Sequence, residues 1–169
     1  VNVFVNNCDV CGAPICVEDY PTYYNLVGRV DRALTISNNP AAANVVDHMM
    51  LRPGALHRAN GGYLVMGARE VLTNPYAWDA LKRSLKANCV RVEEMGQEYR
   101  FVFTATIEPE PIPLSIKVVL IGEPLIYYLL QAYDEDFREL FKVKADFAVV
   151  MDRNDQSVDQ YARFIANVC

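Results

Sequence analysis

The sequence predicts an α/β fold with a mainly parallel central sheet, flanking helices and a β-hairpin arm. Residues 63–66 form a short apolar run after a turn of small residues, which is typical of a buried strand in a parallel sheet. Residues 116–121 form an uninterrupted β-branched and aliphatic run, which favours a central parallel strand. Segments with apolar residues at helical spacing follow both runs.

The first thirty residues predict strands. Residues 1–6 alternate between apolar and polar side chains, and we expect residues 15–18 to pair with them as a hairpin arm. Residues 25–30 also predict a strand. The polar, Ala/Asn-rich residues 31–44 are expected to form a loop or mobile insert.

The middle of the chain predicts a strand at 45–51, a helical turn at 68–72 and then a longer helix that ends near residue 87. Asn74 is expected to cap this helix, with Pro75 at its first position. The other expected elements are strands at 90–94 and 99–107, an extended linker with three prolines at 108–113, helices at 125–133 and 135–141, a strand at 145–151 and a final helix at 155–167.

Composition bounds the class of protein. With 169 residues and 52% hydrophobic content, the chain can bury one sizeable core, and we expect a single domain over 1–169. The net charge of -5, without a basic stripe, gives no reason to expect nucleic acid, and no apolar run approaches the roughly 20 residues that span a bilayer. Because the chain begins with Val1 instead of Met, we expect it to be cut from a longer protein.

The five cysteines favour reduced thiols over a disulfide framework, because their number is odd. Cys8, Cys11 and Cys16 lie in one short segment and contain half of a zinc-site pattern. The second Cys pair that a closed zinc site needs is missing, so three free thiols are favoured and no metal is expected.

Four long motifs carry a resemblance to a known family. They are residues 21–29 (Pro-Thr-Tyr-Tyr-Asn-Leu-Val-Gly-Arg), 52–62 (Arg-Pro-Gly-Ala-Leu-His-Arg-Ala-Asn-Gly-Gly), 108–122 and 136–147. In order and over nearly the whole chain, they resemble the Lon-related ATP-dependent proteases, in the branch whose AAA+ module carries a long coiled-coil insertion.

The resemblance implies a partial AAA+ module. Members are cytoplasmic, ring-forming machines that use ATP and Mg²⁺ to unfold proteins, which a Ser-Lys dyad then cuts. The chain would cover the second half of the module, with a β arm at 1–30, an insert and strand at 31–52, the Walker B to sensor region at 53–151 and a terminal helix at 152–169. It has no G-x-x-x-x-G-K-[ST] phosphate loop, so alone it is expected to have no catalytic residue and no cofactor.

The resemblance also points to nucleotide-site residues. A Walker B strand normally ends in Asp-Glu, whose Asp lies in the Mg²⁺ shell, but Gly67 and Ala68 stand here. Glu70 is either a substitute carboxylate or a solvated residue of a short helix. Glu123 stands at the sensor 1 position, although repulsion from phosphate favours a helix cap instead. Arg138 is either an arginine finger for a neighbouring subunit or part of surface ion pairs.

Three tyrosines and one histidine also have two interpretations each. Tyr20, Tyr23 and Tyr24 either grip substrate in a pore or pack against the sheet, and the strand expected at 25–30 favours packing. His57 is expected to hold the Gly61–Gly62 turn by hydrogen bonding, since no nucleophile lies at a spacing that suits general-base chemistry.

Three functions therefore compete. The first is part of the ATPase module of a Lon-like serine protease, which forms a homo-oligomeric ring and acts on protein substrates. The second is a non-enzymatic scaffold for oligomerisation or substrate contact, with a degenerate nucleotide site. The third is a small metal-binding adaptor built on Cys8, Cys11 and Cys16.

Overall fold

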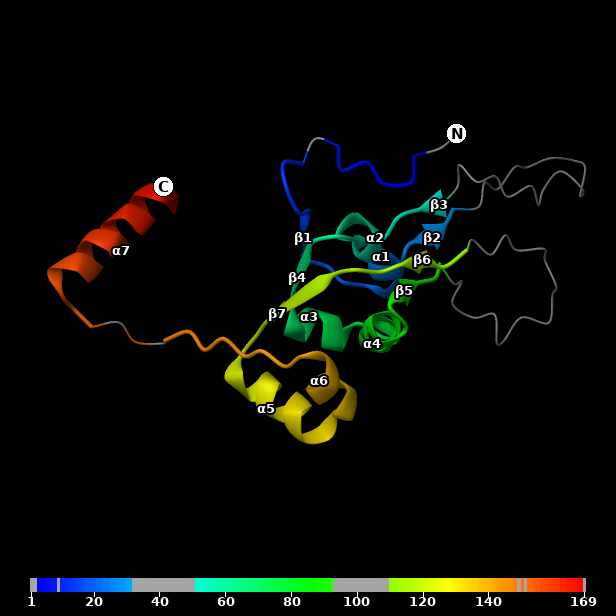
Figure 1. Ribbon diagram of the computed structural model, residues 1–169. Coiled ribbons are helices and arrows are strands. Elements are labelled where there is room, and N and C mark those ends of the chain that lie inside the picture. The colour runs from blue at the N-terminus through cyan, green and yellow to red at the C-terminus, as the bar shows by residue number, and fades with distance from the viewer. Residues whose placement is uncertain are drawn as a thin grey trace, which may run out of the picture.

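The computed structural model describes residues 3–8, 10–31, 51–92, 110–148, 150 and 152–168 (Figure 1). The strands are β1 (Ile15–Glu18), β2 (Arg29–Val30), β3 (Leu51–Arg52), β4 (Tyr63–Gly67), β5 (Cys89–Val90), β6 (Ile112–Pro113) and β7 (Lys117–Ile121). The helices are α1 (Tyr23–Val27), α2 (Ala55–Arg58), α3 (Ala68–Thr73), α4 (Ala77–Ala87), α5 (Pro124–Tyr133), α6 (Glu135–Leu140) and α7 (Asp155–Val168).

The main sheet is parallel and has the order β1-β4-β7. Ile15 pairs with Tyr63 at the start of β1, and Gly67 pairs with Ile121 at the end of β7. The other strands of the described ranges form two antiparallel two-stranded sheets, β2-β3 and β5-β6. The prediction of an α/β fold with a parallel sheet and flanking helices is confirmed, but the central strand is β4, and β7 lies at an edge of the described sheet.

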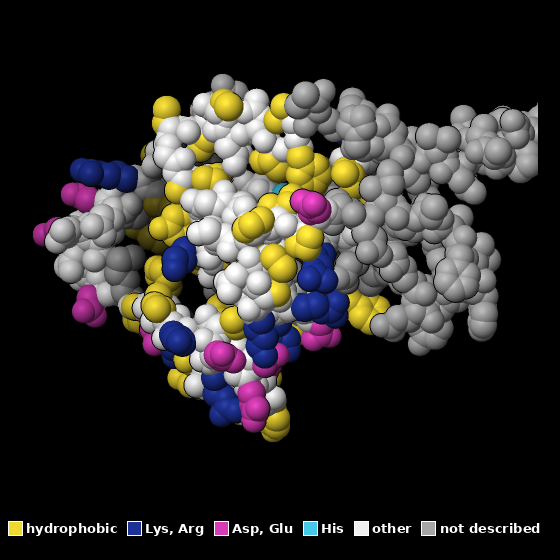
Figure 2. Space-filling view, turned by 45° about the vertical axis from the view of Figure 1, so that its right-hand side comes forward, with side chains coloured by type: hydrophobic (Ala, Val, Ile, Leu, Met, Phe, Trp, Pro, Cys, Tyr) yellow, Lys and Arg dark blue, Asp and Glu magenta, His cyan; other side chains and the backbone are white. Residues whose placement is uncertain are grey.

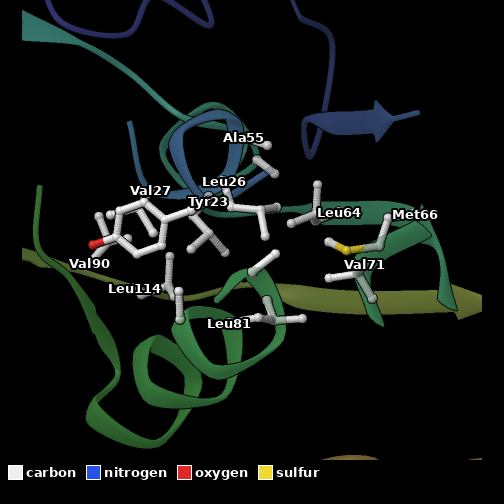
Figure 3. Packing of buried hydrophobic residues seen from close by; sticks show 14 residues of the cluster. Tyr23, Leu26, Val27, Ala55, Leu64, Met66, Val71, Leu81, Val90 and Leu114 are labelled. Carbon is white, nitrogen blue, oxygen red and sulfur yellow. The ribbon is translucent and has the colours of Figure 1, made fainter. Parts of the chain in front are cut away.

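The core lies against one face of this sheet. Leu64 and Met66 of β4 point from that face and are almost fully buried. They contact a cluster that includes Leu26 of α1, Val71 of α3 and Leu81 of α4 (Figure 3). Because side chains alternate along a strand, the intervening residues of all three strands point to the opposite face.

Close backbone contacts fix the start of β4. The Tyr63 amide donates to the Pro14 carbonyl, and the Lys117 amide donates to the Gly62 carbonyl. A Cβ atom on Gly62 would overlap the Pro14 carbonyl oxygen, so only glycine fits there. Asn60 holds the same turn, since its side chain donates to the Pro113 carbonyl and accepts from the Ser115 amide at 2.9 and 2.8 Å.

The predicted β-hairpin arm is wrong. Residues 3–8 form no strand, and β1 pairs in parallel with β4 instead of antiparallel with the N-terminal segment. The physical reason is that β4 offers a partner in whose register Cys16 lies beside Leu64 and packs, partly buried, against the core.

The strand predicted at 25–30 is also largely wrong, because α1 occupies residues 23–27 and only Arg29–Val30 form a strand. Thr22 caps this helix by accepting the Asn25 amide at 3.2 Å. Its buried residues Tyr23, Leu26 and Val27 follow helical spacing, a pattern too short to be separated from a strand by sequence alone.

The helix predicted from Asn74 begins instead at Ala77, after Tyr76 in a left-handed conformation with φ of 62°. The Asn74 side chain donates to the Glu70 carbonyl at 2.8 Å, so it ends α3 and does not cap α4. One face of α4 packs on the core, since Leu81 is buried and Trp78 and Leu85 pack against the same cluster.

Helices predicted at 68–72, 125–133, 135–141 and 155–167 are confirmed as α3, α5, α6 and α7. The strand predicted at 145–151 is absent from residues 145–148, which form neither helix nor strand. The insert at 31–44, most of the strand at 45–51 and the strands at 90–94 and 99–107 lie largely outside the described residues, apart from the short strands β3 and β5.

A half-buried carboxylate joins α6 to α4. Asp134 accepts hydrogen bonds from the Trp78 indole at 2.8 Å and the Lys82 ammonium at 2.9 Å, and it caps α6 by accepting the Phe137 amide. Burial acts to raise the pKa of Asp134, but these donors outweigh it and lower the pKa from 3.8 to about 2. Trp78 also stacks on Phe141. Basic and acidic side chains are interspersed in this lower part of the molecule (Figure 2).

Replacing Asp134 by Asn is expected to lower the free energy of unfolding by about 2 kcal/mol at neutral pH, as measured by urea titration. Because the folded-state pKa is depressed, this contribution is present above about pH 4 and is lost as the pH falls towards 2. Asp79 is a matched control, since it lies 3.6 Å from the same Lys82 but is 68% exposed. D79N should change stability by less than about 0.5 kcal/mol, and equal effects of both variants would contradict the prediction.

Candidate functional site

The carboxyl ends of the three parallel strands meet at one edge of the sheet. Glu18 ends β1 opposite Met66, and Gly67 ends β4 opposite Ile121 of β7. The backbones are close here, because a Cβ atom on Gly122 would lie 2.9 Å from the Cβ of Ala68. Open α/β sheets bind their ligands at this edge, so it is the candidate site.

Gly67 and Glu70 are brought together at this edge. Gly67 is the residue before the first turn of α3, and Glu70 lies in that turn. A Cβ atom on Gly67 would overlap the Glu70 Oε2 atom and lie 2.7 Å from its Cδ. The Glu70 carboxylate therefore lies where a side chain of residue 67 would begin.

The Glu70 carboxylate is exposed, and no hydrogen-bond donor or cation in the described ranges reaches it. Its backbone carbonyl, by contrast, accepts bonds from Thr73 Oγ1 at 3.1 Å and from Asn74. The carboxylate is thus available to a ligand, whereas the backbone of Glu70 has a structural role in ending α3.

Glu123 follows β7 on the neighbouring strand end, two residues beyond the partner of Gly67. It stands at the N-cap position of α5, as the cap interpretation requires, but its side chain makes no capping hydrogen bond. Pro124 at the first helical position has no amide hydrogen to donate. The other amides of that turn donate no hydrogen bond to the Glu123 carboxylate. Glu123 is therefore the N-cap residue of α5, as predicted, but without a side-chain hydrogen bond.

Arg138 is not brought to this edge. It lies on α6, which packs against α4 and α5, and its guanidinium is 3.7 Å from the Glu135 carboxylate. Both side chains are largely exposed, so this pair stabilises the helix weakly. The alternative role of Arg138, as an arginine finger, requires a neighbouring subunit.

Sequence analysis missed an ion pair at the same end of the sheet. Arg58 of α2 donates to the Glu18 carboxylate at 2.8 Å across 40 residues of sequence. Burial raises the pKa of the nearby Cys16 thiol, although Arg58 acts to lower it, so this thiol is not activated. No local sequence signal links Arg58 to Glu18, because the contact depends on the pairing of β1 with β4.

His57 does not hold the Gly61–Gly62 turn as predicted. Its Nδ1 accepts the Gly54 amide at 3.2 Å, which fixes the start of α2, while Asn60 holds the turn. The neutral ring then carries its proton on Nε2, a buried atom with no hydrogen-bond partner in the described part of the chain. The ring of Phe4 lies edge-on to it, with centroids 4.9 Å apart.

The three tyrosines have different environments. Tyr23 is 8% exposed and belongs to the core, so packing is confirmed for this residue. Tyr20 and Tyr24 are exposed, and Tyr24 makes an edge contact with the ring of Tyr23.

The metal-binding interpretation of the cysteines has no support in the described residues. Cys8, Cys11, Cys16 and Cys89 are free thiols. No three His, Cys, Asp or Glu side chains of the described ranges come together in a metal-binding arrangement. In the same ranges, none of the helices combines the length and the apolar character needed to cross a membrane.

A parallel sheet with its candidate site beyond adjacent strand ends is typical of nucleotide-binding α/β domains. A model of the family described as "LonB-like, AAA domain" matches residues 11–148 of the chain. The chain belongs to this LonB-like AAA domain family.

A curated relative is similar over part of the chain. It is the protein of Escherichia coli (strain K12) named "Putative Lon protease homolog", which is 31% identical over 124 residues. The matched part covers 68% of this chain and 19% of the relative. The chain thus spans about a fifth of the length of this relative.

The buried His57 predicts a pH-dependent stability. Burial lowers the pKa of His57 from 6.5 to about 4, so below pH 6.5 the unfolded chain takes up a proton that the folded one does not. The free energy of unfolding should therefore fall by about 3 kcal/mol between pH 7 and pH 4. In His57→Gln this part of the pH dependence should disappear, as measured by urea titration at each pH. Parallel pH profiles of the two proteins would contradict the prediction.

Proposed function

We propose that this chain is the second half of the AAA+ ATPase module of a Lon-like ATP-dependent serine protease. It contributes one wall of the nucleotide site and is inert alone. The match of the LonB-like AAA family over residues 11–148 is the observation that carries this proposal.

The exposed side of the sheet supports a partial module. Ile15, Val17, Val119 and Ile121 point away from the core and are 41 to 70% exposed. Parallel sheets are normally covered on both faces, and β7 has no partner on its outer edge among the described strands. A further segment bearing a strand and a helix would complete this sheet. Hydrophobic side chains are visible at the molecular surface in Figure 2.

The residues present fit one part of a Mg²⁺-ATP site. The unpaired Glu70 carboxylate fills the space next to Gly67 and is a suitable oxygen ligand for a hard cation. The bound metal would neutralise phosphate charge during hydrolysis. The phosphate loop that would hold the phosphates themselves is not part of this sequence.

The proposal gives the other candidate residues separate roles. Glu123 would lie beside the phosphates at the sensor 1 position, where its unbonded side chain is free to orient water. Arg138 would release Glu135 and reach the nucleotide of a neighbouring subunit, which requires a homo-oligomeric ring. Protein substrates and a cytoplasmic location belong to the same proposal.

The test compares ATP binding and turnover by this 169-residue chain with a longer polypeptide that joins it to a phosphate loop. The longer polypeptide should bind and hydrolyse ATP, and a variant in which Ala replaces its phosphate-loop lysine should not. The 169-residue chain should do neither, because it has no phosphate cradle.

Binding without turnover by the longer polypeptide would favour the scaffold function, with a degenerate nucleotide site. The absence of Asp at position 67 is the observation that keeps this second candidate. If the longer polypeptide shows neither ATP binding nor turnover, both the ATPase function and the scaffold with a degenerate nucleotide site are overturned.

A further inference from the structure

We propose that Glu70 supplies the metal-side carboxylate of the nucleotide site, in place of a side chain at position 67. This inference rests on the proposed ATPase function and assigns a role within that site. The Glu70 carboxylate lies beside Gly67, where the side chain of any other residue at position 67 would begin.

The overlap between the two positions is the main argument. A Cβ atom on Gly67 would overlap Glu70 Oε2 and lie 2.7 Å from Cδ and 3.4 Å from Cγ. An Asp at position 67 and the observed Glu70 conformer therefore exclude each other. Glycine at position 67 is what permits the Glu70 carboxylate to occupy this space.

The local structure explains how Glu70 reaches this position. Helix α3 begins directly after β4, and Glu70 is its third residue. Side chains on a helix point back towards its N-terminus, so a long side chain in the first turn returns to the end of the preceding strand. Glutamate has the length for this return, whereas an Asp at position 67 would point into the same space directly.

The state of the carboxylate argues for a ligand role. None of the described residues donates a hydrogen bond to it or pairs with it, although Arg69 is its neighbour in sequence. A purely structural glutamate in a first helical turn would be expected to accept a hydrogen bond from a backbone amide of that turn, and no such bond joins the Gly67 amide to Glu70. The carboxylate is left facing the edge where the proposed phosphates would lie.

The experiment measures the Mg²⁺ dependence of ATP affinity in the longer polypeptide that contains the phosphate loop. ATP binding is titrated with Mg²⁺ and with EDTA, and Mn²⁺ binding is followed by electron paramagnetic resonance. Glu70→Gln should reduce the Mg²⁺-dependent gain in ATP affinity by about 10-fold or more, with metal-free binding unchanged. Glu110→Gln removes an exposed carboxylate outside the site and should change neither affinity.

A double variant tests the exchange itself. Gly67→Asp combined with Glu70→Ala should restore the Mg²⁺-dependent affinity that is lost in Glu70→Ala, because the carboxylate returns to position 67. In the 169-residue chain, Gly67→Asp alone should lower the Tm by about 3 °C through like-charge crowding, and Glu70→Ala should relieve that loss.

The outcomes separate this inference from the proposed function. If the longer polypeptide binds no ATP, the ATPase function fails and the role of Glu70 fails with it. If it binds Mg²⁺-ATP and Glu70→Gln leaves the metal dependence unchanged, the ATPase function stands and the role of Glu70 is overturned.

Discussion

The pairing of β4 with a parallel strand on each side is the constraint on which the rest of the structure depends. Five residue pairs join β4 to β7 and four join it to β1. These pairings require close backbone approach at the start of β4, which Gly62 permits and Asn60 secures through Pro113 and Ser115. They also give the sheet a face on which Leu64 and Met66 are buried, and they align the strand ends at the candidate site.

Helix packing follows from that sheet. The cluster of Leu26, Val71 and Leu81 covers the core face, and α4 in turn carries Trp78 and Lys82 to the Asp134 carboxylate. Two side-chain donors and one backbone amide offset the partial desolvation of this carboxylate, so Asp134 anchors α6 with its charge paired. The opposite face of the sheet has no such cover in the described ranges, and this asymmetry is the physical argument for the proposal of a partial module.

The family resemblance in the sequence pointed to Gly67 and Glu123 as candidate site residues. The structure places both at the carboxyl ends of neighbouring parallel strands, where ligands of open α/β sheets bind. The overlap of the Glu70 carboxylate with the space beside Gly67 depends on the exact start of α3. The partner of His57 likewise depends on the fold: its ring accepts the Gly54 amide, and Asn60 holds the turn that His57 was expected to hold.

By itself the sequence determined the α/β class, the two parallel strands β4 and β7, and helices α3, α5, α6 and α7, because these segments have uninterrupted apolar runs or helical periodicity. The tertiary structure decided the rest. It placed β4 at the centre, drew Ile15–Glu18 into the parallel sheet and made Tyr23–Val27 a helix. Short apolar segments fit a strand or a helix equally well, and the partner that buries their apolar side chains decides between the two.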